Sequence, residues 1–173
     1  KNGKIIHVDI DKEELKKHHP KTDFKINYDA NLILENLLKF KIKEKPDWIN
    51  YCEKIKKYFP LVEKNNITNK GFISPYNFYF DISKIARNKD VIIPCSSGGA
   101  FTTFNQTFEQ KLGQKIINNK ALASMGYGLS GAIGAAFANK NKKILHFEGD
   151  GGFTQNLQEY GTVAINKLNI KTF

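Results

Sequence analysis

Cysteine is scarce in this sequence, and its scarcity narrows the kinds of protein the chain can be. Cys52 and Cys95 are the only cysteines, they lie far apart, and they form no Cys-x-x-Cys pair. The pattern is not that of a disulfide framework, so we expect a reducing compartment, the cytoplasm.

Long apolar runs are missing as well. No stretch approaches the roughly 18 consecutive apolar residues of a transmembrane helix, and the first residues are polar and lack the pattern of a signal peptide. We therefore expect no membrane partner. Apolar residues still make up 40% of the chain and aromatic residues 12%, which is typical of a globular protein rather than a disordered one.

Arginine is nearly absent from a chain whose formal net charge is +10. Arg87 is the only arginine among 27 lysine and arginine residues, and the lysines are scattered with only modest clusters. Base readout and phosphate clamping favour arginine. We therefore interpret the positive charge as a solvated, lysine-rich surface and expect no nucleic-acid partner.

Four short apolar runs predict strands, at residues 4–10, 91–93, 143–147 and 169–173. From residue 71 onward, strand patterns alternate with helical patterns. Such alternation is typical of an α/β protein, in which helical crossovers join parallel strands. We predict a parallel sheet with helices on both faces.

Capping residues and prolines mark the expected helix starts. Asp11 and Asp29 are predicted to cap two helices, the first beginning near residue 12, and Pro46 is predicted to be the first residue of a third. Ser74 and Pro75 are expected to start a helix that buries Phe78, Ile82, Ile85 and Ala86. A last helix is expected at residues 155–166.

The domain organisation follows from these elements. Residues 1–40 hold one predicted strand and two predicted helices, too little for a domain, so we interpret them as the end of one. Residues 41–70 are interpreted as a charged linker and a helix. Residues 71–173 carry the alternating pattern and are interpreted as the first part of a second domain.

The most informative stretch is Glu148-Gly149-Asp150-Gly151-Gly152, set between a predicted strand and a predicted helix. Ligands of open α/β sheets bind at the carboxyl ends of the strands, where this stretch is expected to lie. Asp150 can hold a hard cation, and the glycines let backbone N–H groups approach phosphate oxygens. The stretch therefore predicts a site for a metal-bound diphosphate.

A second loop of small residues follows the predicted strand at residues 91–93. It contains Ser97, Gly98, Gly99 and Ala100. A loop of this kind can cradle a phosphate, although it can equally be an ordinary turn from a strand to a helix.

Residues 126–131 match the Gly-x-Gly-x-x-Gly fingerprint of dinucleotide-binding folds, and Glu148 and Asp150 follow about 20 residues later. That fingerprint has to follow a strand directly, and residues 120–125 make a poor strand. We therefore disfavour a dinucleotide enzyme. Glycines and alanines in this stretch also suit a helix that packs closely on a sheet.

Three segments together resemble the thiamine-diphosphate enzymes of the acetolactate synthase type. They are Ser-Ser-Gly-Gly at residues 96–99, Ala-Ser-Met-Gly-Tyr-Gly-Leu-Ser-Gly-Ala-Ile-Gly-Ala at residues 123–135, and Gly-Asp-Gly-Gly-Phe at residues 149–153 with its helix residues 156–159. Residues 4–40 are similar to the end of the family's middle domain. The resemblance covers nearly the whole chain and implies that residues 71–173 are the first part of the domain that binds the diphosphate.

The resemblance implies a role for each matching position. Asp150 would be the first protein ligand of Mg²⁺, and the flanking glycines Gly149, Gly151 and Gly152 would line the diphosphate. Ser97, Gly98, Gly99 and Ala100 would hold its other side.

The other end of the cofactor would lie against Met125, whose backbone carbonyl would accept from the amino group of the aminopyrimidine, and Ala123 would approach the same ring. No residue of the chain is assigned a catalytic role by the resemblance.

The activity that the resemblance implies is decarboxylation of a 2-oxo acid and transfer of the activated aldehyde. The resemblance also implies a homodimer or homotetramer, and it allows FAD as a further cofactor. This chain has Gly99-Ala100 where acetolactate synthases usually have Gln-His. The departure leaves open a sister activity, such as a lyase of sugar or surface-polysaccharide biosynthesis.

The family's metal motif ends in an Asn-Asn pair, and its activating glutamate comes from the N-terminal domain of a partner subunit; neither is in this sequence. We therefore expect a fragment, cut at both ends and inactive alone. A non-catalytic paralogue that binds the cofactor is the alternative from another functional class.

Overall fold

A computed structural model describes residues 3–41, 43–68, 70–95 and 97–173 of the chain. The chain divides into two compact units, Lys1–Glu53 and Lys54–Phe173, which we call the amino-terminal and the carboxy-terminal unit. This division concerns compactness alone. The assignment of residues 1–40, 41–70 and 71–173 to parts of domains stays a prediction.

The amino-terminal unit contains a two-stranded parallel sheet. Strand β1 (Ile6–Asp9) pairs with β2 (Phe24–Asn27), in a register that runs from Ile6 opposite Phe24 to Asp9 opposite Asn27. The expected strand at residues 4–10 is confirmed. Strand β2 was not expected, since its four residues carry too short an apolar pattern to be recognised.

Of the two helices expected in this unit, one is confirmed and one is wrong. Helix α1 (Ala30–Leu37) begins at its predicted cap, where Asp29 accepts from the backbone N–H groups of Asn31 at 2.7 Å and Leu32 at 3.3 Å. Near residue 12 there is only a one-turn 3₁₀ helix, η1 (Glu14–Lys16).

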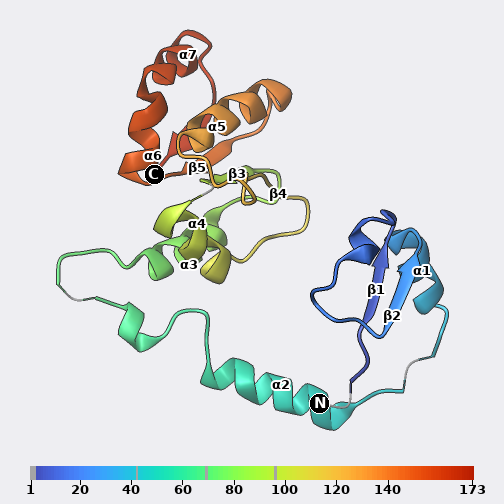
Figure 1. The fold of residues 1–173 in the computed structure, drawn as a ribbon. Helices are drawn as coiled ribbons and strands as arrows, with labels where there is room; N and C mark the ends of the chain where they lie inside the picture. Colours follow the sequence, from blue (N-terminus) through green and yellow to red (C-terminus); the bar gives the residue numbers. More distant parts are fainter. Residues whose placement is uncertain (1–2, 42, 69, 96) are drawn as a thin grey trace. The chain divides into compact units, whose positions relative to one another are not determined.

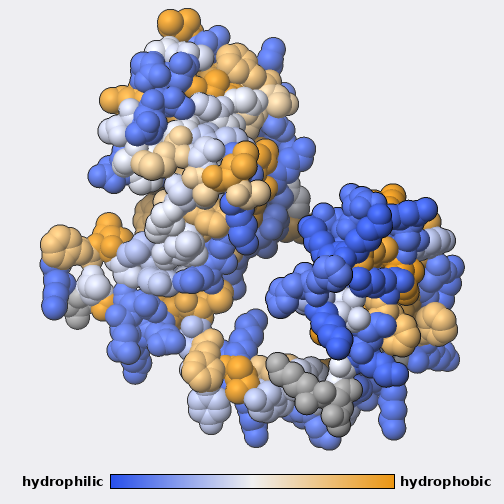
Figure 2. Space-filling view, in the orientation of Figure 1, coloured by the Kyte–Doolittle hydropathy of each residue, from blue (hydrophilic) through white to orange (hydrophobic). Residues whose placement is uncertain are grey.

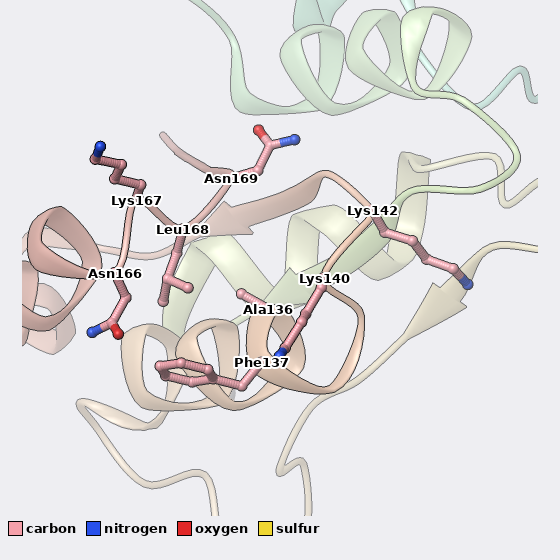
Figure 3. A pocket seen from close by; sticks show the side chains of 8 residues that line it. All are labelled: Ala136, Phe137, Lys140, Lys142, Asn166, Lys167, Leu168 and Asn169. Atoms are coloured by element: carbon pink, nitrogen blue, oxygen red, sulfur yellow. The ribbon is translucent and has the colours of Figure 1, made fainter.

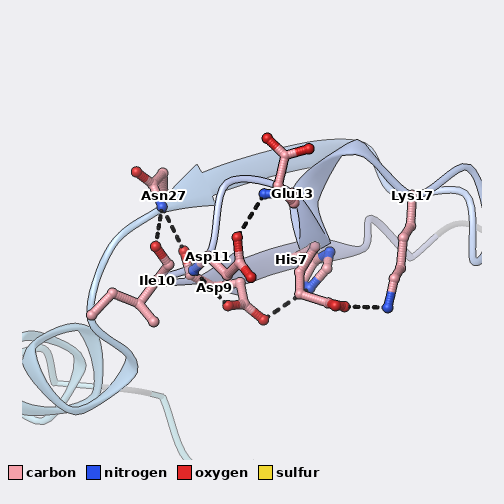
Figure 4. Close-up of polar contacts among 8 residues, drawn as sticks. His7, Asp9, Ile10, Asp11, Glu13, Lys17 and Asn27 are labelled. Carbon is pink, nitrogen blue, oxygen red and sulfur yellow. Dashed lines mark hydrogen bonds and ion pairs between the residues drawn. The ribbon is translucent and has the colours of Figure 1, made fainter.

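Short-range hydrogen bonds explain the missing helix (Figure 4). Asp9 accepts from the N–H of Asp11, and Asp11 accepts from the N–H of Glu13, each at 2.8 Å. Asparagine and aspartate side chains that bond two residues ahead build turns in competition with a helix. The side chain of Asn27 also donates to the carbonyls of Asp9 and Ile10, which ties the ends of the two strands together.

Helix α2 (Pro46–Tyr58) begins at the predicted proline and crosses the boundary between the units. The 3₁₀ helix η2 (Lys64–Asn66) follows it. None of the residues of α2 is buried. Apolar residues, in orange, also lie among the hydrophilic ones on the surface of the amino-terminal unit (Figure 2); they include Leu34, Leu37, Leu38 and Phe40.

The carboxy-terminal unit is built on a four-stranded parallel sheet with the order β4-β3-β5-β6. The strands are β3 (Val91–Pro94), β4 (Lys115–Ile116), β5 (Ile144–Phe147) and β6 (Ile170–Thr172). Every residue of β3 and β5 is buried, as in parallel sheets covered on both faces. The predicted α/β class and the predicted strands at residues 91–93, 143–147 and 169–173 are confirmed.

Helices cover both faces of this sheet (Figure 1), as predicted. Tyr79 of α3 (Pro75–Ile85) and Phe104 of α4 (Gly98–Thr107) pack with Ile92 and Phe147 on one face. On the other face, α5 (Tyr127–Ala138) packs its alanines against the sheet residues Val91, Ile93 and Ile144.

The buried stripe of α3 differs from the prediction by one residue. Ile85 is 75% exposed, and Phe78 and Ile82 are only partly buried. Ala86 is buried as predicted, but it shares its buried face with Tyr79 and Ser83. The predicted positions 78, 82 and 85 and the observed positions 79, 83 and 86 have the same spacing of four and three residues. The periodicity therefore predicted the helix correctly, but packing decided which of two neighbouring faces is buried.

The helix expected at residues 155–166 is broken. The structure has α6 (Asp150–Phe153), the 3₁₀ helix η3 (Thr154–Glu159) and α7 (Tyr160–Ile165), with Asn156 at φ −132° and ψ 24°. The Asn156 side chain donates to the carbonyl of Gly126 at 2.8 Å and to the hydroxyl of Ser130 at 3.0 Å. These bonds to the start of α5 hold Asn156 outside helical geometry.

Candidate cofactor site

The site forms where β3 and β5 end. These strands are neighbours and parallel, so the segments that leave them meet at the carboxyl edge of the sheet. A cavity of about 510 Å³ opens there. Its lining contains all ten residues that the sequence predicted for the cofactor, joined by Cys95: Ser97, Gly98, Gly99, Ala100, Ala123, Met125, Gly149, Asp150, Gly151 and Gly152.

The first wall of the cavity is the start of α4. Ser97 is its N-cap residue but makes no side-chain capping bond to the helix. Gly98 has a positive φ of +66°, and neither Gly98 nor Gly99 has a neighbouring atom within 4 Å of where a Cβ would lie. The N–H groups of a first helical turn lack partners within the helix and attract anions. This wall therefore suits a phosphate group.

Asp150 lies on the opposite wall, as the first residue of α6 after Gly149. Its side chain is exposed, and among the described residues it forms no ion pair. The described residues contain no group of three or more histidine, cysteine, aspartate or glutamate side chains that could hold a metal ion. A single carboxylate such as that of Asp150 is a ligand type that Mg²⁺ accepts when its other ligands are phosphate oxygens and water.

Met125 contributes the third side of the cavity. Its side chain is 55% exposed, and its Cε lies 3.1 Å from the position that a Cβ on Gly151 would take. The backbone around it is unusual, with φ of 51° at Ala123 and 82° at Gly126. A Cβ on Gly126 would come within 2.9 Å of the Gln155 side chain, so this turn requires glycine.

Cys95 is the lining residue that sequence reasoning missed, although it directly precedes the predicted loop. Burial raises the pKa of its thiol, while hydrogen bonds with the backbone of Ser97 and Gly149 act against that rise. The thiol donates to the carbonyl of Ser97 at 2.9 Å. A neutral, hydrogen-bonded thiol shapes the cavity and is a poor nucleophile.

A buried polar pair, also missed, lies next to the cavity. The side chains of His146 and Glu148 are 0% and 2% exposed, and His146 Nε2 lies 3.0 Å from Glu148 Oε2. The same carboxylate oxygen accepts from the backbone N–H of Leu129 at 3.1 Å. The signal for His146 was a histidine inside an apolar strand, and Glu148 stood at the start of the stretch at residues 148–152 without a role of its own.

A different cavity, of about 380 Å³, lies at the amino edge of the same sheet (Figure 3). Three lysines line it, among them Lys142 and Lys167. Figure 3 shows these two side chains extending in different directions. They do not converge on one anion, so this cavity is a weaker candidate than the one at the carboxyl edge.

The structure also decides against the dinucleotide fingerprint. Residues 120–125 form turns and irregular backbone, with the N–H of Ala123 bonded to the carbonyl of Asn119 at 2.8 Å. The last strand before Gly126 is β4, which ends at Ile116, whereas the fingerprint requires a strand that leads directly into its first glycine. In a separate respect, no helix among the described residues is long and apolar enough to cross a membrane.

A glycine-lined cavity at the carboxyl edge of a parallel sheet, with Asp150 on one wall, is typical of α/β domains that bind phosphate-bearing ligands. Comparison with known families agrees: residues 97–173 match the family described as thiamine pyrophosphate enzyme, C-terminal TPP binding domain. This match confirms the resemblance to thiamine-diphosphate enzymes that was seen in the sequence.

Individual relatives extend the similarity to nearly the whole chain. The chain is 32% identical to the acetolactate synthase large subunit of Cyanidium caldarium over 99% of its own length and 30% of that protein. It is 31% identical to the acetolactate synthase isozyme 1 large subunit of Escherichia coli over 98% and 30%. For the chloroplastic acetolactate synthase 1 of Zea mays the identity is 28%, over 99% and 27%. The chain therefore spans about 30% of the length of these relatives.

Proposed function

We propose that the chain is part of a thiamine-diphosphate and Mg²⁺-dependent enzyme that decarboxylates a 2-oxo acid and transfers the activated aldehyde to a second carbonyl. The observation that carries the proposal is the single cavity that gathers the glycine loops, Met125 and Asp150. The names of the relatives support the acetolactate-synthase-like class.

In this proposal the bound cofactor supplies the carbon nucleophile and the electron sink. The residues of the chain bind and orient it. N–H groups at the start of α4 hold the diphosphate, Asp150 holds the cation that neutralises it, and Gly149, Gly151 and Gly152 let the backbone approach. Met125 supports the aminopyrimidine, with its carbonyl as acceptor.

The remaining expectations are proposals of the same kind. We propose a homodimer or homotetramer in the cytoplasm, of a class that allows FAD as a further cofactor of the complete protein. Gly99 and Ala100 place no polar side chain at the diphosphate loop. A panel of 2-oxo acids and acceptor aldehydes tests whether acetolactate or another carboligation product is formed.

The direct test is calorimetric titration of the complete protein that contains this chain. Thiamine diphosphate is added with Mg²⁺ and then with a chelator, and we expect binding only with the metal. Asp150→Ala should weaken the binding more than about tenfold, the scale already seen for residues that merely support metal ligands. Asp81→Ala, which removes an exposed carboxylate on α3, is the matched control and should leave the affinity unchanged.

The outcomes separate the proposals. No thiamine-diphosphate binding by the unsubstituted protein would contradict the proposed function. Unchanged affinity in Asp150→Ala would contradict the metal role alone. Tight Mg²⁺-dependent binding without turnover of any 2-oxo acid would favour the non-catalytic paralogue.

A further inference from the structure

Three buried or partly buried side chains form a continuous polar chain behind the cofactor cavity. Thr172 Oγ1 lies 3.1 Å from His146 Nδ1, and His146 Nε2 lies 3.0 Å from Glu148 Oε2. The backbone N–H of Leu129 donates to that same oxygen at 3.1 Å. These hydrogen-bonded side chains therefore connect β6, through β5, to the first turn of α5.

The pairing of the strands decides on which face of the sheet these polar side chains lie. His146 and Thr172 are register partners on neighbouring parallel strands, so both side chains lie on the same face of the sheet. Residue Ile144, two positions before His146, packs with α5. Alternation along β5 therefore turns His146 toward α5.

The donors and acceptors match at every hydrogen bond of this polar network. Glu148 Oε2 accepts from the N–H of Leu129, and a carboxylate oxygen accepts from His146 Nε2 as well, while His146 Nδ1 pairs with the Thr172 hydroxyl. Each buried polar group then has a partner, as such networks require.

Two glycines show how tightly Glu148 is enclosed. A Cβ on Gly128 would lie 2.5 Å from Glu148 Oε2 and 2.7 Å from His146 Nε2. A Cβ on Gly152 would lie 2.6 Å from Glu148 Oε1. The Glu148 carboxylate is thus held between the first turn of α5 and the backbone of α6.

These contacts join the two halves of the cavity. Glu148 is two residues from Asp150 on the diphosphate side, and it bonds to Leu129, four residues from Met125 on the pyrimidine side. We propose that Glu148 is a positioning residue that sets the spacing between the pyrimidine and diphosphate halves of the cofactor site, braced by His146 and Thr172. This inference rests on the proposed function.

The test compares the whole cofactor with one of its parts. Calorimetry on the complete protein with Mg²⁺ gives the Kd of thiamine diphosphate and, separately, of inorganic diphosphate. Glu148→Ala should weaken the binding of thiamine diphosphate by about tenfold or more, the usual scale for residues that support a ligand. The Kd of inorganic diphosphate should change by less than about twofold. A ligand that occupies one half does not sense the spacing between the halves.

A second variant perturbs Glu148 without removing it. Gly128→Ala should give the same signature, because its Cβ displaces the carboxylate. The controls are Glu148→Gln, which keeps an acceptor for Leu129 and should restore the affinity for thiamine diphosphate, and Gly134→Ala on the same helix, where a Cβ meets nothing within 4 Å. Thermal unfolding of every variant, followed by circular dichroism, shows whether each is folded.

Unchanged thiamine-diphosphate affinity in both folded variants would overturn the positioning role, and so would an equal loss of both ligands. If the unsubstituted protein bound inorganic diphosphate but not thiamine diphosphate, the proposed function would fall as well. The proposed function survives, and only this inference fails, when the unsubstituted protein binds the cofactor and the variants bind it equally well.

Discussion

The two compact units of this chain use the same kind of parallel strand pairing with very different results. The carboxy-terminal unit buries β3 and β5 completely between helices. In the amino-terminal unit, Leu15 is the one core residue among the described positions, β2 is exposed throughout and β1 is at most partly buried. Two paired strands lack the area for a core, so parallel pairing is stable only where both faces are covered.

The contrast extends to what holds each unit in shape. Side-chain hydrogen bonds define the amino-terminal unit: Asp9, Asp11 and Asp29 accept from nearby backbone N–H groups, and Asn27 donates from β2 to the carbonyl of Asp9 at the end of β1. Packing defines the carboxy-terminal unit, where the cofactor cavity also lies. A site that needs several loops held at fixed spacing is therefore found on the unit with a core.

The largest expected difference in stability between the two units follows from replacing one phenylalanine in each of them. Phe147 is fully buried and its ring packs against those of Phe173 and Tyr79, each at 5.3 Å between centroids. Phe147→Ala should lower the free energy of unfolding by about 3–5 kcal/mol. Phe24→Ala, at a ring that is 48% exposed, should cost under about 1 kcal/mol. Denaturant titration measures both, and equal costs would remove the contrast.

Two glycines of α5 allow a tightly packed position and an open position of the carboxy-terminal unit to be compared. Gly128→Ala should destabilise the fold by about 1–3 kcal/mol, because the added Cβ overpacks the buried Glu148 and His146. Gly134→Ala should instead stabilise it by about 0.5–1 kcal/mol, since alanine favours a helix and meets no neighbour. Effects of the same sign in thermal unfolding would show that the two ends of α5 are not packed differently.

Tyr79 makes the packed unit sensitive to high pH. Burial raises the pKa of its hydroxyl from 10.0 to about 12. A group whose pKa is higher in the folded state contributes stability below its unfolded pKa and loses that contribution above it. The free energy of unfolding should therefore fall between pH 10 and about pH 12, and less so in Tyr79→Phe. Tyr28→Phe in the amino-terminal unit is the control; an equal effect of that change would contradict the assignment.

The smallest perturbation compares the two cysteines without changing the fold. Cys52 is exposed on α2, whereas Cys95 is buried and its pKa is raised by burial. At pH 8, Cys95 should react with a soluble disulfide reagent at least about tenfold more slowly than Cys52. Mass spectrometry of the single variants Cys52→Ser and Cys95→Ser assigns the rates, and similar rates would mean that the cavity wall opens readily.

Much of the carboxy-terminal unit could be predicted because local and global signals agree there. The runs at residues 91–93 and 143–147 are apolar throughout, as fully buried parallel strands require. The failures occur where a side chain prefers a specific polar partner to its helix. Asp11 bonds to the N–H of Glu13 and Asn156 bonds to α5, and neither choice is visible in periodicity.

The sequence by itself determined the types of most elements, the class of the fold and the glycine and aspartate residues of the candidate site, because these depend on short-range patterns and on backbone freedom. Only the tertiary structure decided which face of α3 is buried, that Cys95 joins the cavity and that Glu148 links α5 to Asp150. These are contacts between residues far apart in the sequence, and their geometry exists only once the strands have paired and the helices have packed.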